Sequence, residues 1–183
     1  MKNACLIPLL IFVFTSCTKV QREESGFEVF LIKKGQHNSR SAFVSYDDSI
    51  LKFDVVFDSS AIYKIVARED KEDVNKLFGM TDCGMANHMN SARIGWRWFQ
   101  DSLQLFSYVY CNSVRTITYI TSVNIGETVH CSITAKRGEY VFLVNSVLHN
   151  EKRICTGNDR YLQYPYFGGN RLAPHNISIK IDY

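Results

Sequence analysis

The sequence predicts an all-β protein, a two-sheet antiparallel jelly-roll sandwich. Two observations predict this fold. From Phe27 onward, short segments rich in β-branched and aromatic residues alternate between apolar and polar positions, as strands do. Tight-turn residues at 100–101, 112–113 and 137–138 join several of these segments into hairpins. Many short strands at this spacing are typical of sandwiches and jelly rolls.

The first segment, residues 1–16, has the plan of a secretory signal peptide. Its apolar run, from Leu6 to Phe14, follows a lysine near the start. The run is too short to span a bilayer, which takes about 20 apolar residues. It ends in the letters TSC, which resemble the lipobox of bacterial lipoproteins, and Cys17 is the residue that would carry the lipid. The alternative is an ordinary cleaved signal in which Cys17 has no role.

The rest of the chain divides into a tether and one domain. Residues 17–25 are polar and lack aromatics, which is typical of a short tether, and residues 26–183 form the predicted jelly-roll domain. Stable attachment to a membrane takes more than one acyl chain, and the lipoproteins that this segment resembles carry several on the cysteine. We therefore expect a membrane-anchored protein of the bacterial cell envelope, at the outer membrane.

Composition argues against several other partners. The formal net charge is +3 and no basic block occurs, so no nucleic acid is expected. No residues have metal-ligand spacing, so neither a metal site nor a cofactor is predicted. In an oxidising compartment, the cysteines after the lipobox permit two disulfides, whose pairing the sequence leaves open. These cysteines are Cys83, Cys111, Cys131 and Cys155.

In the first half of the domain, the segments with a period of two are 27–34, 41–46, 50–58 and 61–67. Each is predicted to be a strand, because β-branched and aromatic residues dominate it and turn residues bound it. The run of mixed charges at 68–73 predicts a solvated loop or one helical turn.

Residues 91–123 predict three antiparallel strands with two-residue turns between them. With the first turn at Gln100-Asp101, Trp98 lies opposite Leu103 and the pairing of all the other residues follows. A slip of one residue would exchange the two faces. The residues expected on the core side are Ala92, Ile94, Trp96, Trp98, Leu103, Leu105 and Val109.

The opposite face of these strands mixes arginine, glutamine and aromatic residues. Sugars present apolar C–H faces and rims of hydroxyl groups, so their binding sites combine aromatic rings with planar hydrogen-bonding groups. This face therefore predicts a glycan site. The alternative is a solvated sheet face, because aromatic residues are common in strands. The residues expected to bind the ligand are Arg93, Arg97, Gln104, Tyr108 and Tyr110.

Residues 127–146 predict another hairpin, with Gly138 supplying the positive φ of its turn. Its apolar positions place His130 on the side away from the core. The core side is expected to carry Cys131, Ile133, Phe142 and Val144.

The chain ends in a segment that alternates strictly. In residues 176–183, the isoleucines Ile177, Ile179 and Ile181 share one side, which predicts a half-buried final strand. Residues 161–167 predict one more strand, in which Pro165 requires a sheet edge or a bulge.

Three stretches resemble bacterial surface lipoproteins with a concanavalin A-like lectin/glucanase jelly-roll domain: LFGMTDCGMANHMNSARIGWRW, EYVFLVNS and YPYFGGNRLAPHNISIKI. The resemblance extends from Leu77 to Ile181. It implies two bent sheets, one of them concave, with glycans or peptides lying along the concave sheet. With the lipobox, it implies an envelope-anchored carbohydrate-binding lipoprotein with a glycan partner and no catalytic residues.

Two other functions remain open. One is a polysaccharide lyase acting on acidic glycans, in which arginine neutralises a uronate carboxylate while histidine or tyrosine moves protons. The glutamate between the arginines, the glutamine before the histidine and the final lysine of such lyases are absent, which argues against turnover. The other is a structural or protein-binding accessory role. The lyase candidates, by resemblance to alginate lyases, are Arg93, Arg97, His130, Tyr164 and Tyr166.

Overall fold

The computed structural model describes residues 26–64 and 73–183. The signal peptide at 1–16, the tether at 17–25 and Cys17 with it lie outside the described residues. Among the residues that are described, no helix has the length and apolar character needed to cross a membrane.

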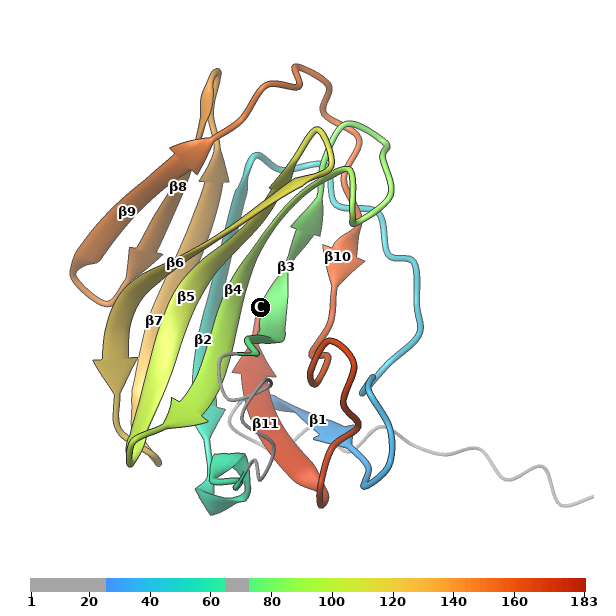
Figure 1. Cartoon of the computed structure of the whole chain (residues 1–183). Helices are drawn as coiled ribbons and strands as arrows, with labels where there is room; N and C mark the ends of the chain where they lie inside the picture. Colours follow the sequence, from blue (N-terminus) through green and yellow to red (C-terminus); the bar gives the residue numbers. More distant parts are fainter. Residues whose placement is uncertain (1–25, 65–72) are drawn as a thin grey trace, which may run out of the picture.

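The described residues form two antiparallel sheets, packed face to face with the core between them (Figure 1). The six-stranded sheet has the order β1 (Glu28–Ile32), β11 (Ile177–Asp182), β2 (Ile50–Phe57), β7 (Thr128–Ala135), β8 (Glu139–Val144) and β9 (Val147–Lys152). The five-stranded sheet has the order β10 (Leu162–Gln163), β3 (Asn75–Thr81), β4 (Asn90–Phe99), β5 (Ser102–Cys111) and β6 (Val114–Val123). The predicted all-β, two-sheet antiparallel jelly roll is confirmed.

The register predicted for β4 and β5 is also confirmed. Trp98 pairs with Leu103, and Arg93 pairs with Tyr108. The connecting turn explains why: Gln100 and Asp101 have φ angles of 51° and 55°, the left-handed pair that a two-residue type I′ turn needs. Such a turn fixes which residues face each other, and the alternation of apolar side chains then fixes the buried side.

The core lies between the sheets and includes the predicted residues. Trp96 has 0% exposure and packs its ring 5.3 Å, centroid to centroid, from that of Phe57 on the other sheet. Trp98 is the exception, because it is only half-buried at the edge of the core. The other predicted core residues are all buried: Ala92, Ile94, Leu103, Leu105, Val109, Cys131, Ile133, Phe142, Val144, Ile177, Ile179 and Ile181.

Two strand predictions in the first half were wrong. Residues 41–46 form no strand and make only an isolated bridge, from Ser45 to Tyr161. Of the predicted strand at 61–67, residues 65–67 lie outside the described residues, and residues 61–64 form no strand because the chain makes a short 3₁₀ turn there, η1 (Ser59–Ala61). The Asp58 side chain caps that turn by accepting a hydrogen bond from Ser60 N. The predicted segment 161–167 is shortened to β10, and Pro165 lies beyond its end.

Two strands were not predicted, β3 and β9. Strand β3 is buried on both faces and carries a bulge between Lys76 and Phe78, so its sequence shows no alternation. Strand β9 is a largely exposed edge strand with a polar sequence.

One of the two permitted disulfides is present: Cys83 is bonded to Cys155. Cys111 and Cys131 are free thiols. Cys131 is buried in the core, and this burial raises the pKa of its thiol far above the usual value.

Candidate functional site

The predicted ligand-binding residues do share the outer face of the five-stranded sheet, but they form two groups. Near the turn that joins β4 to β5, Arg97 Nε donates a hydrogen bond of 2.8 Å to Gln104 Oε1. Towards the other end of the same strands, Arg93 lies beside Tyr108, and Tyr108 contacts Tyr110. The centre of this face is not solvated, since Arg93 is only 4% exposed and Tyr108 only 3%.

Arg93 is the most unusual residue of this face. Its guanidinium lies 4.9 Å from the centroid of the Tyr108 ring. Its Nε and Nη2 atoms are buried and have no hydrogen-bond partner in the described part of the chain. Burial lowers the pKa of Arg93, because the charged form loses its hydration. A buried cation without a carboxylate partner is costly, and such groups concentrate at functional sites.

Lys76, on β3, adds a second buried cation. Its Nζ donates a hydrogen bond of 2.6 Å to Gly168 O and lies 5.0 Å from the centroid of the Tyr108 ring. Burial, and then the charge of Arg93, lower the pKa of Lys76 to about 8. The sequence did not reveal Lys76, because β3 lacks the alternation by which its outward residues could have been recognised.

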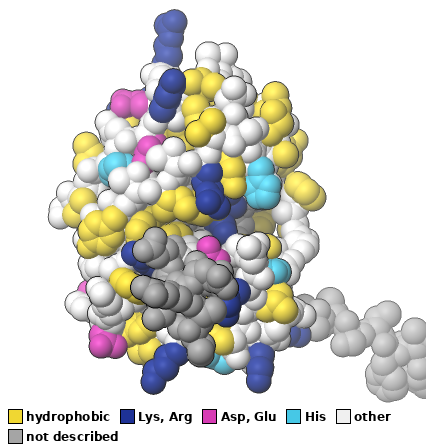
Figure 2. All heavy atoms as spheres, viewed as in Figure 1, with side chains coloured by type: hydrophobic (Ala, Val, Ile, Leu, Met, Phe, Trp, Pro, Cys, Tyr) yellow, Lys and Arg dark blue, Asp and Glu magenta, His cyan; other side chains and the backbone are white. Residues whose placement is uncertain are grey.

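A third cation borders this pair at the edge of the sheet. Arg115, on the exposed strand β6, interacts with the Tyr108 hydroxyl, and this contact raises the pKa of Arg115. The carboxylate that acts on Lys76 is that of Asp73. Figure 2 shows Lys and Arg side chains, together with His, in the middle of the face that Figure 1 presents. The centre of this face is therefore positively charged.

A groove of about 810 Å³ opens beside Arg93. Its floor is the outer side of β10 and β3, with Gln163 and Thr81, and Arg93 lines it from β4. One rim is the segment 38–43, and the other is the loop between β3 and β4, at 84–87. The groove thus combines a buried cation with side chains from four separate parts of the chain.

Aromatic rings line the groove as well. Tyr166 stacks on His37 with 4.9 Å between the ring centroids and an interplanar angle of 5°. His37 is held in place by its Nδ1, which donates to Phe167 O at 2.9 Å. On the outer rim, Phe43 makes an edge contact with Tyr161 at 6.4 Å. Aromatic faces of this kind suit the apolar faces of sugar rings.

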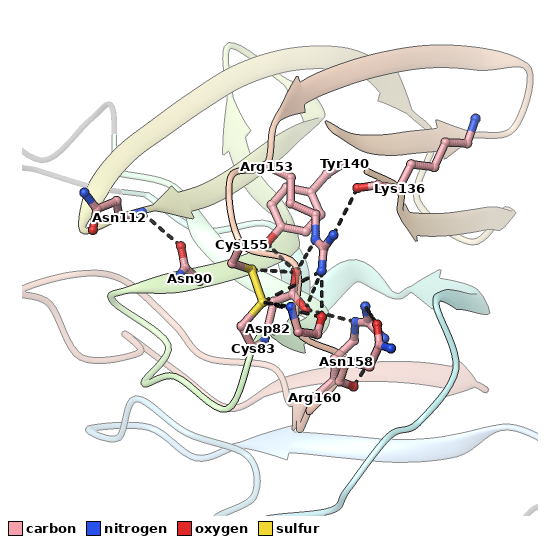
Figure 3. The surroundings of a disulfide bond; sticks show 11 residues. Asp82, Cys83, Asn90, Asn112, Lys136, Tyr140, Arg153, Cys155, Asn158 and Arg160 are labelled. Atoms are coloured by element: carbon pink, nitrogen blue, oxygen red, sulfur yellow. Dashed lines mark hydrogen bonds and ion pairs between the residues drawn. A yellow bond between two sulfur atoms is a disulfide. The ribbon is translucent and has the colours of Figure 1, made fainter. Parts of the chain in front are cut away.

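The rim at 84–87 is anchored by a buried ionic cluster next to the disulfide (Figure 3). Asp82, with 0% exposure, forms ion pairs with Arg153 at 2.5 Å and with Arg160 at 3.1 Å. It also accepts a hydrogen bond of 2.8 Å from the Tyr140 hydroxyl. Because Asp82 follows β3 directly and Cys83 is bonded to Cys155, the loop that begins here is fixed to the segment after β9.

The same cluster does not form a metal site. The ligand atoms of Asp82, Cys83 and Cys155 lie within 4.8 Å of one another. The two sulfur atoms are joined in the disulfide, and the carboxylate is neutralised by its two arginines. Metal-binding cysteines need free thiolates, so this arrangement holds no ion.

The lyase candidates are scattered. His130 lies on the outer face of the other sheet, where its Nδ1 is 2.7 Å from Asp54 Oδ1. Tyr164 is buried in the core, where its ring stacks on that of Phe30 at 5.7 Å. Of these candidates, Arg93, Tyr164 and Tyr166 line the groove, whereas Arg97 and His130 do not. His130 therefore cannot act on a substrate that lies against Arg93.

Comparison with known proteins identifies the fold. No protein-family model and no curated protein sequence matches this chain. A functionally unknown protein from Saccharomyces cerevisiae has a TM-score of 0.57 at 9% identity, covering 88% of this chain and 87% of that one. The alginate lyase AlyC3 has a TM-score of 0.56 at 8% identity, covering 87% and 74%. The marine PL7 alginate lyase AlyA1 from Zobellia galactanivorans has a TM-score of 0.51 at 10% identity, covering 92% and 83%. The chain is similar to these proteins in fold, and at identities this low the similarity shows the fold alone.

Proposed function

We propose that this protein binds an acidic polysaccharide in the groove beside Arg93, with Arg93 pairing with a carboxylate of the glycan. The observation that carries the proposal is the buried Arg93 guanidinium, whose Nε and Nη2 have no partner in the described part of the chain although the residue lines the groove. An arginine presents its N–H groups as a planar fork that matches a carboxylate. A bound uronate would supply the missing acceptor and the missing negative charge together.

The surroundings of Arg93 support an acidic ligand over a neutral one. Lys76 adds positive charge next to Arg93, and each of these cations lies close to the Tyr108 ring. Aromatic and amide side chains of the groove, such as Tyr166 and Gln163, suit the remaining parts of a sugar. The likeness in fold to two alginate lyases, whose names give an acidic polysaccharide as the substrate, is consistent with this choice.

Membrane anchoring through a lipid on Cys17 completes the proposal. The lipobox-like segment supports it, and the site would then act at the bacterial cell envelope, at the outer membrane. A tethered binding protein would retain acidic glycans close to the cell.

The second candidate is a lyase that acts on the same glycans, and Lys76 is the observation in its favour. With a pKa of about 8, part of the Lys76 population is neutral near neutral pH and could accept a proton. The Lys76 Nζ atom lies 5.5 Å from the centroid of the Tyr166 ring. Elimination would remove the proton next to the uronate carboxylate, break the bond to the glycosidic oxygen and return a proton to that oxygen. The hydrogen bond from Lys76 to Gly168 O and the absence of His130 from the site favour binding without cleavage.

A screen of glycans against the full chain, purified in detergent, tests the proposal. We expect polymers of uronic acids to bind and neutral glucans of equal length to bind much more weakly. Ultraviolet absorbance of the same mixtures reports the unsaturated ends that a lyase releases. Binding with constant absorbance would support the binding function. Rising absorbance would show that the protein is a lyase. If no glycan binds above background, the site has another purpose, and the accessory role becomes the better description.

A further inference from the structure

Each rim of the groove carries an exposed apolar side chain beside its polar residues. Phe43 is 91% exposed on one rim, although a large aromatic side chain normally loses free energy in that position. On the other rim, Met85 is 43% exposed. The residues next to them along the chain, Ala42 and Ala86, also line the groove and carry only methyl groups. Apolar side chains therefore meet the solvent on both sides of the opening.

The exposed apolar side chains of the rims match sugar hydroxyl groups poorly. A hydroxyl that loses its water against Phe43 or Met85 gains no hydrogen bond in exchange, because neither side chain has a strong donor or acceptor. Polar groups lie beside them on the rims, on Asn38, Arg40, Ser41 and Asn87, and on the floor, on Gln163. A ligand that fits the whole groove therefore carries a charged group for the floor and small apolar groups that reach the rims.

The charge on the floor restricts the ligand further. Arg93 requires an anion, so a neutral apolar ligand would leave its Nε and Nη2 without partners. A long acyl chain would cover Phe43 and Met85 but would give the amide groups of Asn87 and Gln163 no hydrogen bonds. A sugar that bears a carboxylate and short esters offers an anion for Arg93, apolar methyl groups for the rims and hydroxyl groups for the amide side chains.

We infer that the groove recognises acidic glycans that carry short O-acyl esters, such as acetylated uronate polymers, with the ester methyl groups against Phe43 and Met85 and the uronate carboxylate on Arg93. This inference rests on the proposed function. It adds that the ester substituents, and not the sugar backbone alone, decide which acidic glycan is held. Each buried methyl group is expected to tighten binding about fourfold, the factor that corresponds to ~0.8 kcal/mol per buried carbon.

The test compares one uronate polymer in two forms, O-acetylated and de-esterified by mild alkali, both at the same chain length. Affinities are measured with the full chain in detergent, for the parent and for Phe43→Ser combined with Met85→Ser. The matched control is Leu148→Ser, which removes an exposed apolar side chain from β9, in the other sheet. An acetylated neutral glucan serves as the probe without charge.

We expect the acetylated polymer to bind the parent several-fold more tightly than its de-esterified form. The double variant should bind the two forms equally, whatever its affinity for the sugar backbone, whereas the Leu148 variant should behave as the parent does. Equal binding of the two forms by the parent would overturn the inference and leave the proposed function standing. A preference that survives in the double variant would also overturn it, because the esters would then lie elsewhere. Binding of the acetylated neutral glucan as tightly as the acidic one would overturn the role of Arg93, and failure of both uronate forms to bind would overturn the proposed function itself.

Discussion

Gly79 on β3 leaves the space that the side chain of Arg93 on β4 occupies. The two residues are paired across the strands, and a Cβ at Gly79 would lie 2.7 Å from Arg93 Cγ and 2.2 Å from the carbonyl oxygen of Ala92. No side chain fits at these distances, so the absence of a Cβ at Gly79 is what allows a long cationic side chain to lie flat over the sheet. The groove with its buried cation therefore depends on a glycine in a neighbouring strand.

Replacing Arg93 by methionine should raise stability. The variant keeps much of the side-chain volume and removes a buried charge whose Nε and Nη2 have no hydrogen-bond partner in the described part of the chain. The cation–π contact with Tyr108 is lost, but relief of the desolvated charge outweighs it, and we expect a net gain of about 1 kcal/mol. Urea unfolding of the two proteins without ligand measures the difference. A loss of more than about 1 kcal/mol would mean that Arg93 is a structural cation with a partner of its own.

Lys76 should make the binding of acidic glycans depend on pH. Its pKa in the folded protein is lowered to about 8, so the lysine is charged below that pH and neutral above it. Affinity should therefore fall as the pH rises through about 8, while Arg93 and Arg115 stay charged. Titrations between pH 6.5 and 9.5 (approximate assay limits, about 1.5 units on either side of that pKa) measure the effect. In Lys76→Met the profile should be flat, and an unchanged slope in that variant would assign the titration to another group.

Lys76 should also make the stability of the ligand-free protein rise with pH, whereas the affinity for glycans falls. Between the folded pKa of about 8 and the ordinary lysine pKa of 10.5, the unfolded chain binds more protons at this site than the folded protein does. The contribution of Lys76 to the free energy of unfolding therefore increases with pH over that window. The parent should gain stability relative to Lys76→Met as the pH rises from 8 towards 10, which chemical denaturation at a series of pH values can detect.

Glu151 should link the open edges of the two sheets. It lies on β9, and its Oε1 accepts hydrogen bonds from Ser107 on β5 and Thr118 on β6, each at 2.7 Å, and contacts His149 Nε2 at 2.8 Å. Burial alone would raise the pKa of Glu151, but the hydrogen bonds from His149, Thr118 and Ser107 outweigh it and hold the pKa below the usual value. The stability that this carboxylate contributes is therefore present above its unfolded pKa, near 4.5, and is lost as the pH falls through its lower folded pKa.

Glu151→Leu should destabilise the fold by about 1–3 kcal/mol, because the buried hydroxyl of Ser107 loses its acceptor at 2.7 Å and keeps a longer contact of 3.4 Å with Thr118 O. The acid unfolding transition of this variant should also be shallower than that of the parent. Glu139→Leu, on the neighbouring strand β8, is the matched control, since the Glu139 carboxylate accepts a hydrogen bond of 2.9 Å from Asn150 at an exposed position. Equal effects of the two substitutions would show that Glu151 does not link the sheets.

Cys17 should carry the lipid. Metabolic labelling with a palmitate analogue is expected to label the parent and not Cys17→Ala, and the variant should leave the membrane fraction. Equal label in both proteins would show that Cys17 carries no lipid and that residues 1–16 are an ordinary secretory signal.

The sequence was sufficient for one half of the fold and insufficient for the site. The type I′ turn at Gln100-Asp101 fixed the register of β4 and β5, so the shared face of Arg93 and Tyr108 could be derived residue by residue. The burial of Arg93 could not be derived, because the groove around it is built by segments far apart in the sequence, from residue 38 to Tyr166. Lys76 was missed for a local reason, since a strand buried on both faces has no period of two.

The most direct test of the account is the affinity of the full chain for a uronate oligomer, compared between the parent, Arg93→Met and Arg137→Met. Arg137 is exposed in the turn between β7 and β8, so its substitution changes the net charge equally and leaves the groove intact. Loss of a charge-assisted pair should weaken binding by Arg93→Met at least tenfold, a change of about 1.4 kcal/mol, and Arg137→Met should bind as the parent does. Equal affinity of the Arg93 variant and the parent would contradict the account, because the buried arginine would then have no part in holding the glycan.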